Sequence, residues 1–285
     1  MAIVKMKRLR MVDMTGDREE LPRLLQHMGC VEIVQPEADP EDPLWATLVP
    51  PETGGLAAAQ EEKNQAERAL EVLKRYAPAK KGLLSPRPGV RENELLDQTR
   101  AQKAREAARQ VNLLDRRLAA IHAQENKLEG QRLALLPWMS LDLPLETGST
   151  SQVTVQLGTL PASVPMGLAE GEVQAAGELA QLTQVSADRD SNYCMLQCHS
   201  SQQKGVLEAL KNLGWSRANL RDWTGTASDN LNRLAQEAKA LEKEAASIEE
   251  QLRGMGELNA PLRQLSDLAG VEISREESRG SLLET

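Results

Sequence analysis

Two cysteines and a histidine stand close together in the second half of the chain, where Cys194 and Cys198 precede His199. Thiolate and imidazole groups are the usual ligands of a structural zinc ion, which needs about four of them in a tetrahedron. If this segment is a strand, both cysteines lie on one face and His199 on the other, because side chains alternate along a strand. No second cysteine pair supplies the missing ligands. We therefore predict no metal site and interpret both cysteines as buried, small apolar side chains.

Motifs for other kinds of catalysis do not occur in the sequence. It has no phosphate-binding Gly-x-x-x-x-Gly-Lys-Ser/Thr run, no Gly-x-Ser-x-Gly elbow and no His-Glu-x-x-His pair. Besides His199, only His27 and His122 could serve as bases near neutral pH, and His122 fits an exposed position on a helix. We predict no catalytic residue, no cofactor and no enzymatic activity.

Binding is the chemistry that the remaining side chains favour. The best interaction candidate is a pair of tryptophans with two arginines between them: Trp215, Arg217, Arg221 and Trp223. Tryptophan and arginine are typical of the residues that dominate protein interfaces, although the tryptophans also fit simple packing inside a domain. A second candidate is a basic cluster near the N-terminus, which is either a solvated strand edge or a docking patch for an acidic partner: Lys5, Lys7, Arg8 and Arg10.

Composition excludes several classes of protein. The 285 residues carry a formal net charge of −8, and only 2% are aromatic. An acidic chain with so few aromatic rings is a poor match for duplex DNA or for base stacking. No apolar run approaches the length of a membrane span, and three cysteines fit a reducing cytosol. We expect a cytoplasmic chain rich in long helices, with no nucleic acid or small-molecule partner.

The chain divides into five parts. Residues 1–50 predict a β-α-β unit, whose helix carries Leu21, Leu24, Leu25 and Met28 on one face and whose second strand is 31–34. Two strands do not form a stable sheet, so later strands must complete this first lobe. Residues 55–136 predict outgoing helices, 150–225 a second α/β lobe, 227–269 a returning helix, and 270–285 the start of the return to the first lobe, with a strand just beginning in the final residues.

Two of the helical segments carry an apolar repeat with alternating spacings of three and four residues. This spacing is typical of a coiled-coil seam. The seam residues are Val111, Leu114, Leu118, Ile121 and Leu128 in the outgoing segment, and Leu231, Leu234, Leu241, Ile248 and Leu252 in the returning one. Glu125 and Arg132 interrupt the first seam, where they either set the register or mark the end of cover by a third helix. Gly254, Gly256 and Pro261 weaken the returning helix near its end.

These elements predict an α+β fold. Residues 92–136 and 227–269 are of similar length and are separated by a compact insert, so we expect them to pair antiparallel with a left-handed supercoil. The second lobe then lies at one end of this bar and the first lobe at the other, which gives a dumbbell. Whether residues 56–77 double back or continue outward stays open.

Several segments in order along the chain resemble subunit I (subunit a) of the V-type and A-type rotary ATPases. They begin with residues 2–12 and 24–33 at the N-terminus. Three more follow: Leu136-Pro-Trp-Met-Ser-Leu-Asp-Leu143 after the long helix, Leu210-Lys-Asn-Leu-Gly-Trp215 at a helix-to-strand turn, and Gly225-Thr-Ala-Ser-Asp-Asn-Leu231 at the start of the returning helix.

The resemblance implies a non-catalytic stator: a cytoplasmic arm of two α/β lobes on a helical bar, lying along the membrane. In this family the lobes receive the peripheral stalks, heterodimers of subunits E and G, and so resist torque during proton or sodium transport. Other partners are the subunit's own membrane domain, the rotor-ring sector and the central-stalk cap. This sequence reaches Thr285 without a membrane segment, so we expect a fragment and assign no proton-translocating arginine. A free-standing coiled-coil scaffold is the alternative.

Overall fold

The computed structural model describes residues 6–9, 11–17, 19–34, 47–49, 54–78, 89–220 and 222–283. The chain divides into two compact units, one made of residues 1–117 with 248–285 and the other of residues 118–247. The boundaries between the units fall inside two helices, α4 (Gln98–Leu135) and α7 (Ala227–Gly254). Helices and a β-sheet both occur among the described residues, so the predicted α+β class is confirmed.

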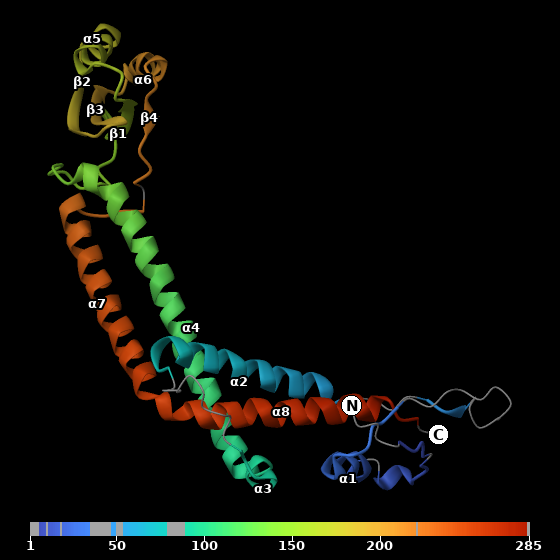
Figure 1. The fold of residues 1–285 in the computed structure, drawn as a ribbon. Helices are drawn as coiled ribbons and strands as arrows, with labels where there is room; N and C mark the ends of the chain where they lie inside the picture. The colour runs from blue at the N-terminus through green and yellow to red at the C-terminus, as the bar shows by residue number, and fades with distance from the viewer. Residues whose placement is uncertain are drawn as a thin grey trace. The chain divides into compact units, whose positions relative to one another are not determined.

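The sheet of the second unit has four antiparallel strands in the order β2-β3-β1-β4 (Figure 1). Its long strands are β1 (Val153–Pro161), β2 (Ala180–Ala187) and β3 (Ser191–His199), and β4 (Ser216–Arg217) is a two-residue edge. Helix α5 (Met166–Ala176) and helix α6 (Gln203–Asn212) complete this α/β lobe. The sequence predicted the strands and α6 but missed α5, whose periodicity is interrupted by Gly167 and Gly171.

The core of this lobe lies between the sheet and its two helices. Along β3, burial alternates strictly, so that every second side chain from Asn192 to Cys198 is buried. Val173 of α5 and Val206 and Leu210 of α6 are fully buried in the same cluster. Strand alternation therefore gives the sheet one face covered by helices and one half-buried face.

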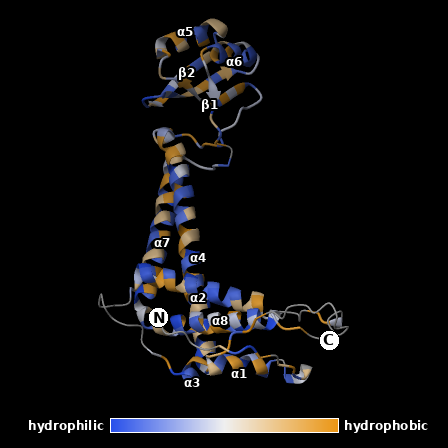
Figure 2. Ribbon diagram, turned by 45° about the vertical axis from the view of Figure 1, so that its right-hand side comes forward, coloured by the Kyte–Doolittle hydropathy of each residue, from blue (hydrophilic) through white to orange (hydrophobic). Residues whose placement is uncertain are grey.

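Below the sheet, the parts of α4 and α7 that belong to the second unit run side by side in opposite chain directions (Figures 1 and 2). Their predicted seam positions all lie on the covered side: Leu118, Ile121, Leu128, Leu234 and Leu241 are buried, and Leu231 is half-buried. Glu125 and Arg132, which interrupt the seam, are also half-buried. Arg132 pairs with Glu129 on its own helix at 2.7 Å, which raises the pKa of Arg132 and lowers that of Glu129.

The first unit is a helical packing of α2 (Leu56–Tyr76), the start of α4, and α8 (Asn259–Gly280). Helix α2 doubles back along α8: Asn259 bonds the carbonyl of Ala77 just past the end of α2, whereas Glu276 lies against Gly55 at its beginning. Small side chains (Ala59, Ala66, Ala69, Ala101, Ala104 and Ala108) fill much of this core, and the predicted seam residues Val111 and Ile248 are buried in the same unit. Helix α3 (Glu92–Leu95) precedes α4.

The returning helix is not the single helix predicted over 227–269. Helix α7 ends at Gly254, a 3-10 turn covers Gly256–Leu258, and α8 continues to Gly280. Glycine weakens a helix, and Pro261 falls in the first turn of α8, where its missing N–H needs no helical partner. Residues 270–280, predicted as the start of the return to the first lobe, are helical. The strand expected in the final residues falls partly on 284–285, which lie outside the described residues.

The N-terminal segment has its predicted helix but not its predicted second strand. Helix α1 spans Glu20–Met28 and ends at Gly29, whose φ of 63° is the left-handed conformation typical of a C-terminal glycine. Residues 31–34 form no strand, since no described strand lies beside them to share hydrogen bonds. Met6, Leu9 and Val12 stay largely exposed. Of the first predicted strand, residues 1–5 and Arg10 fall outside the part of the chain described.

Among the residues that the structure describes, no helix has the length and apolar character needed to cross a membrane.

Candidate functional site

The tryptophan–arginine candidate is divided by the structure into buried and accessible parts. Trp215 begins the turn into β4, and its backbone N–H donates to the carbonyl of Leu210 at 3.0 Å. Its indole ring covers Gly158 of β1 so closely that a Cβ there would lie 2.3 Å from Trp215 Cζ2. The ring packs on the core of the lobe, so Trp215 acts first as a core residue.

Arg217 and Trp223 are the parts of this set that offer a surface. Arg217 is exposed on β4, and Trp223 is half-buried in the segment that leads to α7. Arg221 falls outside the described residues. That the four residues form one contact surface stays a prediction.

The basic cluster near the N-terminus is described only in its middle. Lys7 and Arg8 are exposed, and so are Met6 and Leu9 on either side of them. Lys5 and Arg10 fall outside the described residues. The cluster stays a predicted contact surface for an acidic partner.

The cysteines and the histidine of the second unit are separated as the strand pattern predicted. Cys194 and Cys198 are buried on the helix-covered face of β3, and His199 at its end bonds Ser201 Oγ at 2.8 Å through Nδ1. Burial raises the pKa of the Cys194 thiol to about 11 and also raises that of Cys198. Both thiols are therefore protonated at neutral pH. A protonated thiol is a poor metal ligand and a poor nucleophile. No group of three metal-binding side chains occurs among the described residues.

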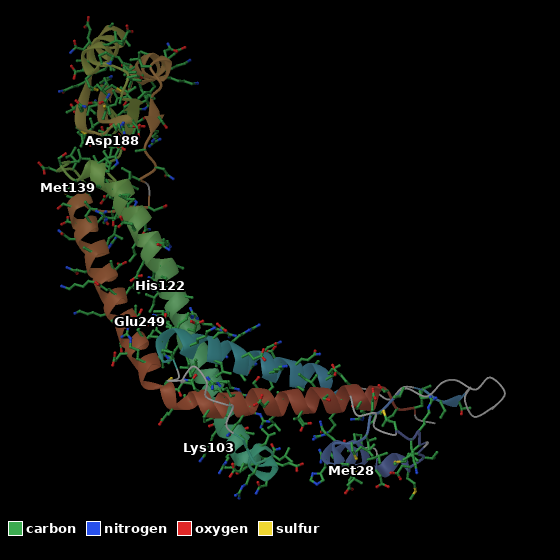
Figure 3. All side chains as sticks on the ribbon, in the orientation of Figure 1. Met28, Lys103, His122, Met139, Asp188 and Glu249 are labelled. Carbon is green, nitrogen blue, oxygen red and sulfur yellow. The ribbon has the colours of Figure 1, made fainter. Side chains whose placement is uncertain are left out.

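The other two histidines lie on helices. His27 of α1 contacts both carboxylate oxygens of Glu92 at 2.9 Å through Nδ1, and this exposed pair helps to hold α1 within the first unit. His122 is exposed on α4, as predicted, and is labelled in Figure 3.

A polar cluster that the sequence reasoning missed holds the junction between the α/β lobe and the helices of the second unit. The chain passes this junction twice, before β1 and after β4, and the two passages bond each other. The backbone N–H of Leu145 donates to the carbonyl of Gly225 at 2.9 Å, and the N–H of Gly225 donates to Glu146 Oε2 at 2.7 Å. We call residues 136–146 with 220 and 222–230 the neck.

Asn230 closes the neck from the side of α7. Its side chain is 2% exposed, and its amide donates to the carbonyls of Thr224 and Thr226 at 2.7 and 2.8 Å. Thr226 Oγ1 accepts from the backbone N–H of Asp229 at 3.1 Å and so caps the start of α7. Thr226 and Ser228 are both residue types that favour a helix cap, whereas nothing in the sequence marked Asn230 as buried.

On the other side of the neck, the Pro-Trp segment packs beneath the sheet. Trp138 is 2% exposed and meets the ring of Tyr193 edge-on, with 5.6 Å between ring centroids. The Tyr193 hydroxyl donates to Asp188 Oδ2 at 2.7 Å, which raises the pKa of Tyr193 and lowers that of Asp188. Figure 3 labels Met139 and Asp188, which flank this part of the neck. These contacts hold the Pro-Trp segment against the sheet, and the described residues among them do not combine an acid, a base and a nucleophile.

The chain is similar in sequence to a known protein along almost its whole length. Over 95% of this chain, the sequence is 23% identical to the A-type ATP synthase subunit I of Methanocaldococcus jannaschii. The predicted resemblance to subunit I is confirmed. The chain spans about two fifths of that subunit I sequence, 42% of its length. No protein-family profile matches the chain.

A solved structure agrees with this result at the level of the fold. It is the crystal structure of the cytoplasmic N-terminal domain of subunit I, the homolog of subunit a, of V-ATPase. The two folds match with a TM-score of 0.55 over 93% of this chain and 85% of the other, at 18% sequence identity. Likeness to subunit I therefore extends through both units rather than through one motif.

Proposed function

We propose that this chain is the cytoplasmic arm of a rotary V-type or A-type ATPase and serves there as part of the stator. The observation that carries the proposal is the likeness to subunit I along 95% of the chain. In this role the protein is non-catalytic, lies on the cytoplasmic face of the membrane, and belongs to a complex that couples ATP to the transport of protons or sodium ions.

The physical requirement on a stator is to transmit force with little bending. Buried aliphatic seams such as that of Leu234 and Leu241 would supply stiffness, because in a coiled coil each seam side chain inserts between side chains of the facing helix. A stator also needs no substrate pocket. The proposal includes the antiparallel coiled-coil bar and the dumbbell. A compact globule of this length has a radius of gyration of about 19 Å, so solution scattering should give a clearly larger value.

Contact with the peripheral stalks is assigned to the lobes. The proposed partners are the E/G heterodimers, with the subunit's own membrane domain and rotor-ring sector beyond them and the central-stalk cap as a further neighbour. Arg217 and Trp223 in the second unit, and Lys7 and Arg8 in the first, are the proposed contact residues that the structure describes. Charged rim residues of this kind act mainly on association rate and selectivity.

Purification of the protein from its own cells tests membership of the complex. A tag on the chromosomal copy should recover the catalytic head together with the E and G subunits from detergent-solubilised membranes. Recovery of the tagged protein without any ATPase subunit would contradict the proposal and favour a free-standing scaffold.

Two variants then test the proposed contact surface. Arg217→Glu, alone or with Trp223→Ala, should weaken recovery of the E/G heterodimer while the protein stays folded. Arg189→Glu is the matched control, because Arg189 is an exposed arginine of the same lobe outside the proposed surface. Equal recovery with both variants would remove Arg217 from the interface without affecting membership of the complex.

A further inference from the structure

We propose that the neck is a clasp that makes the α/β lobe and the paired helix ends of the second unit move as one body. The clasp is the pair of hydrogen bonds by which Leu145 and Glu146 hold the peptide of Gly225. The inference rests on the proposed function for its purpose, since a stator loses force at any loose joint, but its geometry is independent of that function.

The clasp joins two segments that are about 80 residues apart in the sequence. Between them the chain builds the whole α/β lobe, so the bonds at Leu145 and Gly225 close a loop at the point where it leaves the helices. A charge-assisted bond to a carboxylate is stronger than one between neutral groups, and Glu146 supplies that carboxylate at 2.7 Å. If the two connecting segments did not bond each other, the lobe could rotate relative to the helices.

Gly225 is suited to this place by its backbone. Its φ of 76° is in the left-handed region, where a side chain is unfavourable, and the conformation turns both its N–H and its carbonyl toward residues 145–146. The neighbouring residues fix the peptide further, because the buried Asn230 amide binds Thr224 and Thr226 on either side of it. Both polar ends of Gly225 are thus bonded across the neck.

Apolar packing beside the clasp keeps the neck closed but does not define its geometry. Leu141, Leu145, Leu220 and Ala227 are buried there. Such contacts are non-directional, whereas the bonds at Gly225 are directional and set the angle at which the two segments meet. The clasp is therefore the part of the neck whose removal should loosen the lobe without unfolding it.

Spin-label distance measurements on the full chain test the proposal. Labels at Glu172→Cys in the lobe and Glu237→Cys on α7 report the joint, since both positions are exposed and lie in the second unit. The exposed Cys30 is first replaced by serine, and Cys194 and Cys198 are buried. The wild-type neck should give one narrow distance distribution.

The decisive variant is Glu146→Ala, with Asp142→Ala as its matched control. Asp142 is an exposed carboxylate in the same segment without a described hydrogen bond, so its removal changes the charge equally and leaves the clasp intact. Glu146→Ala should lose the single narrow distance, and the Gly225 amide should exchange its hydrogen about tenfold faster, as expected for a lost charge-assisted bond. Asp142→Ala should do neither.

A backbone variant gives an independent reading. Gly225→Ala should broaden the distribution because of its φ, whereas Gly148→Ala, in the segment before β1 and without a positive φ, should not. A broad distribution in the wild-type chain would overturn the proposal, as would a narrow one in both clasp variants. None of these results depends on whether the chain binds the stalk heterodimer, so the clasp and the proposed function fail separately.

Discussion

The α/β lobe of the second unit and the N-terminal segment of the first differ in how completely they bury their apolar residues. In the lobe, Leu196 and Leu210 are 0% exposed, whereas Leu24 and Met28 on the apolar face of α1 are 56% and 54% exposed. The lobe closes because all four of its strands come from one continuous stretch of chain. The N-terminal helix has an amphipathic sequence, but no described sheet covers its apolar face. An amphipathic pattern therefore predicts a helix correctly without showing which element, if any, buries its apolar side.

The largest loss of stability is expected from a substitution at the centre of the lobe. Leu196→Asp places a charge in a site with no exposure and should destabilise by about 4 kcal/mol or more, since an unpaired buried charge is among the most costly substitutions. Leu24→Asp on α1 should cost much less, about 0.5 kcal/mol, because more than half of that residue is already exposed to water. Thermal denaturation of both variants checks the contrast, and equal losses would contradict it.

A similar test applies to the seam of α7. Leu241→Asp should cost about 3 kcal/mol, because Leu241 is 9% exposed and its carboxylate would face the opposite helix. Ala240→Asp, one residue away on the exposed side, is the matched control. An unchanged thermal midpoint for Leu241→Asp would rule out the heptad assignment.

The contact between Gly158 and Trp215 predicts a smaller effect inside the lobe. Gly158→Ala should destabilise by about 1–3 kcal/mol, because the new methyl group would overlap the indole ring and the Ser216 carbonyl. Gly171→Ala on α5 should be neutral or stabilising by up to about 1 kcal/mol, since its Cβ meets nothing and alanine favours a helix. Urea denaturation measures the change in unfolding free energy of both variants, provided that the m-value is unchanged. A stable Gly158→Ala variant would show that Trp215 is loosely packed.

The smallest expected effect is a pH dependence at the edge of the neck. Hydrogen bonds from the Tyr193 hydroxyl and from the backbone of Asp190 and Ser191 lower the pKa of Asp188. This carboxylate therefore contributes stability above its unfolded pKa of about 4, and the contribution is lost as pH falls through the lower, folded value. Asp188→Asn should flatten the acid limb of stability against pH, and an identical acid limb would contradict the assignment.

Sequence patterns predicted those parts of the fold whose contacts are local or periodic. Strand alternation located β1 and β3, and the three-four spacing located the buried faces of α4 and α7. The break at Met255 was foreseen only as a weakness, because the turn there also depends on Ala77 and Asn259, which contact Gly256 and lie far from it in sequence or beyond the break. Pairing of α2 with α8, far apart in sequence, left no signal in either helix alone.

For the candidate site the limits are different. Residue type identified Trp215 as an interface residue or a core residue, and only its position over Gly158 favours the core. Asn230 and Glu146 matter through backbone groups of residues 224–226, which no side-chain motif records. Short polar contacts to main-chain atoms are therefore the part of a site that sequence reading misses most easily.

A direct titration of the purified chain with a purified E/G stalk heterodimer tests the central claim. Isothermal calorimetry should show saturable binding with a defined stoichiometry, weakened by Arg217→Glu and little changed by Arg189→Glu. Absence of binding by a chain whose circular dichroism and thermal unfolding show it to be folded would contradict the stator assignment.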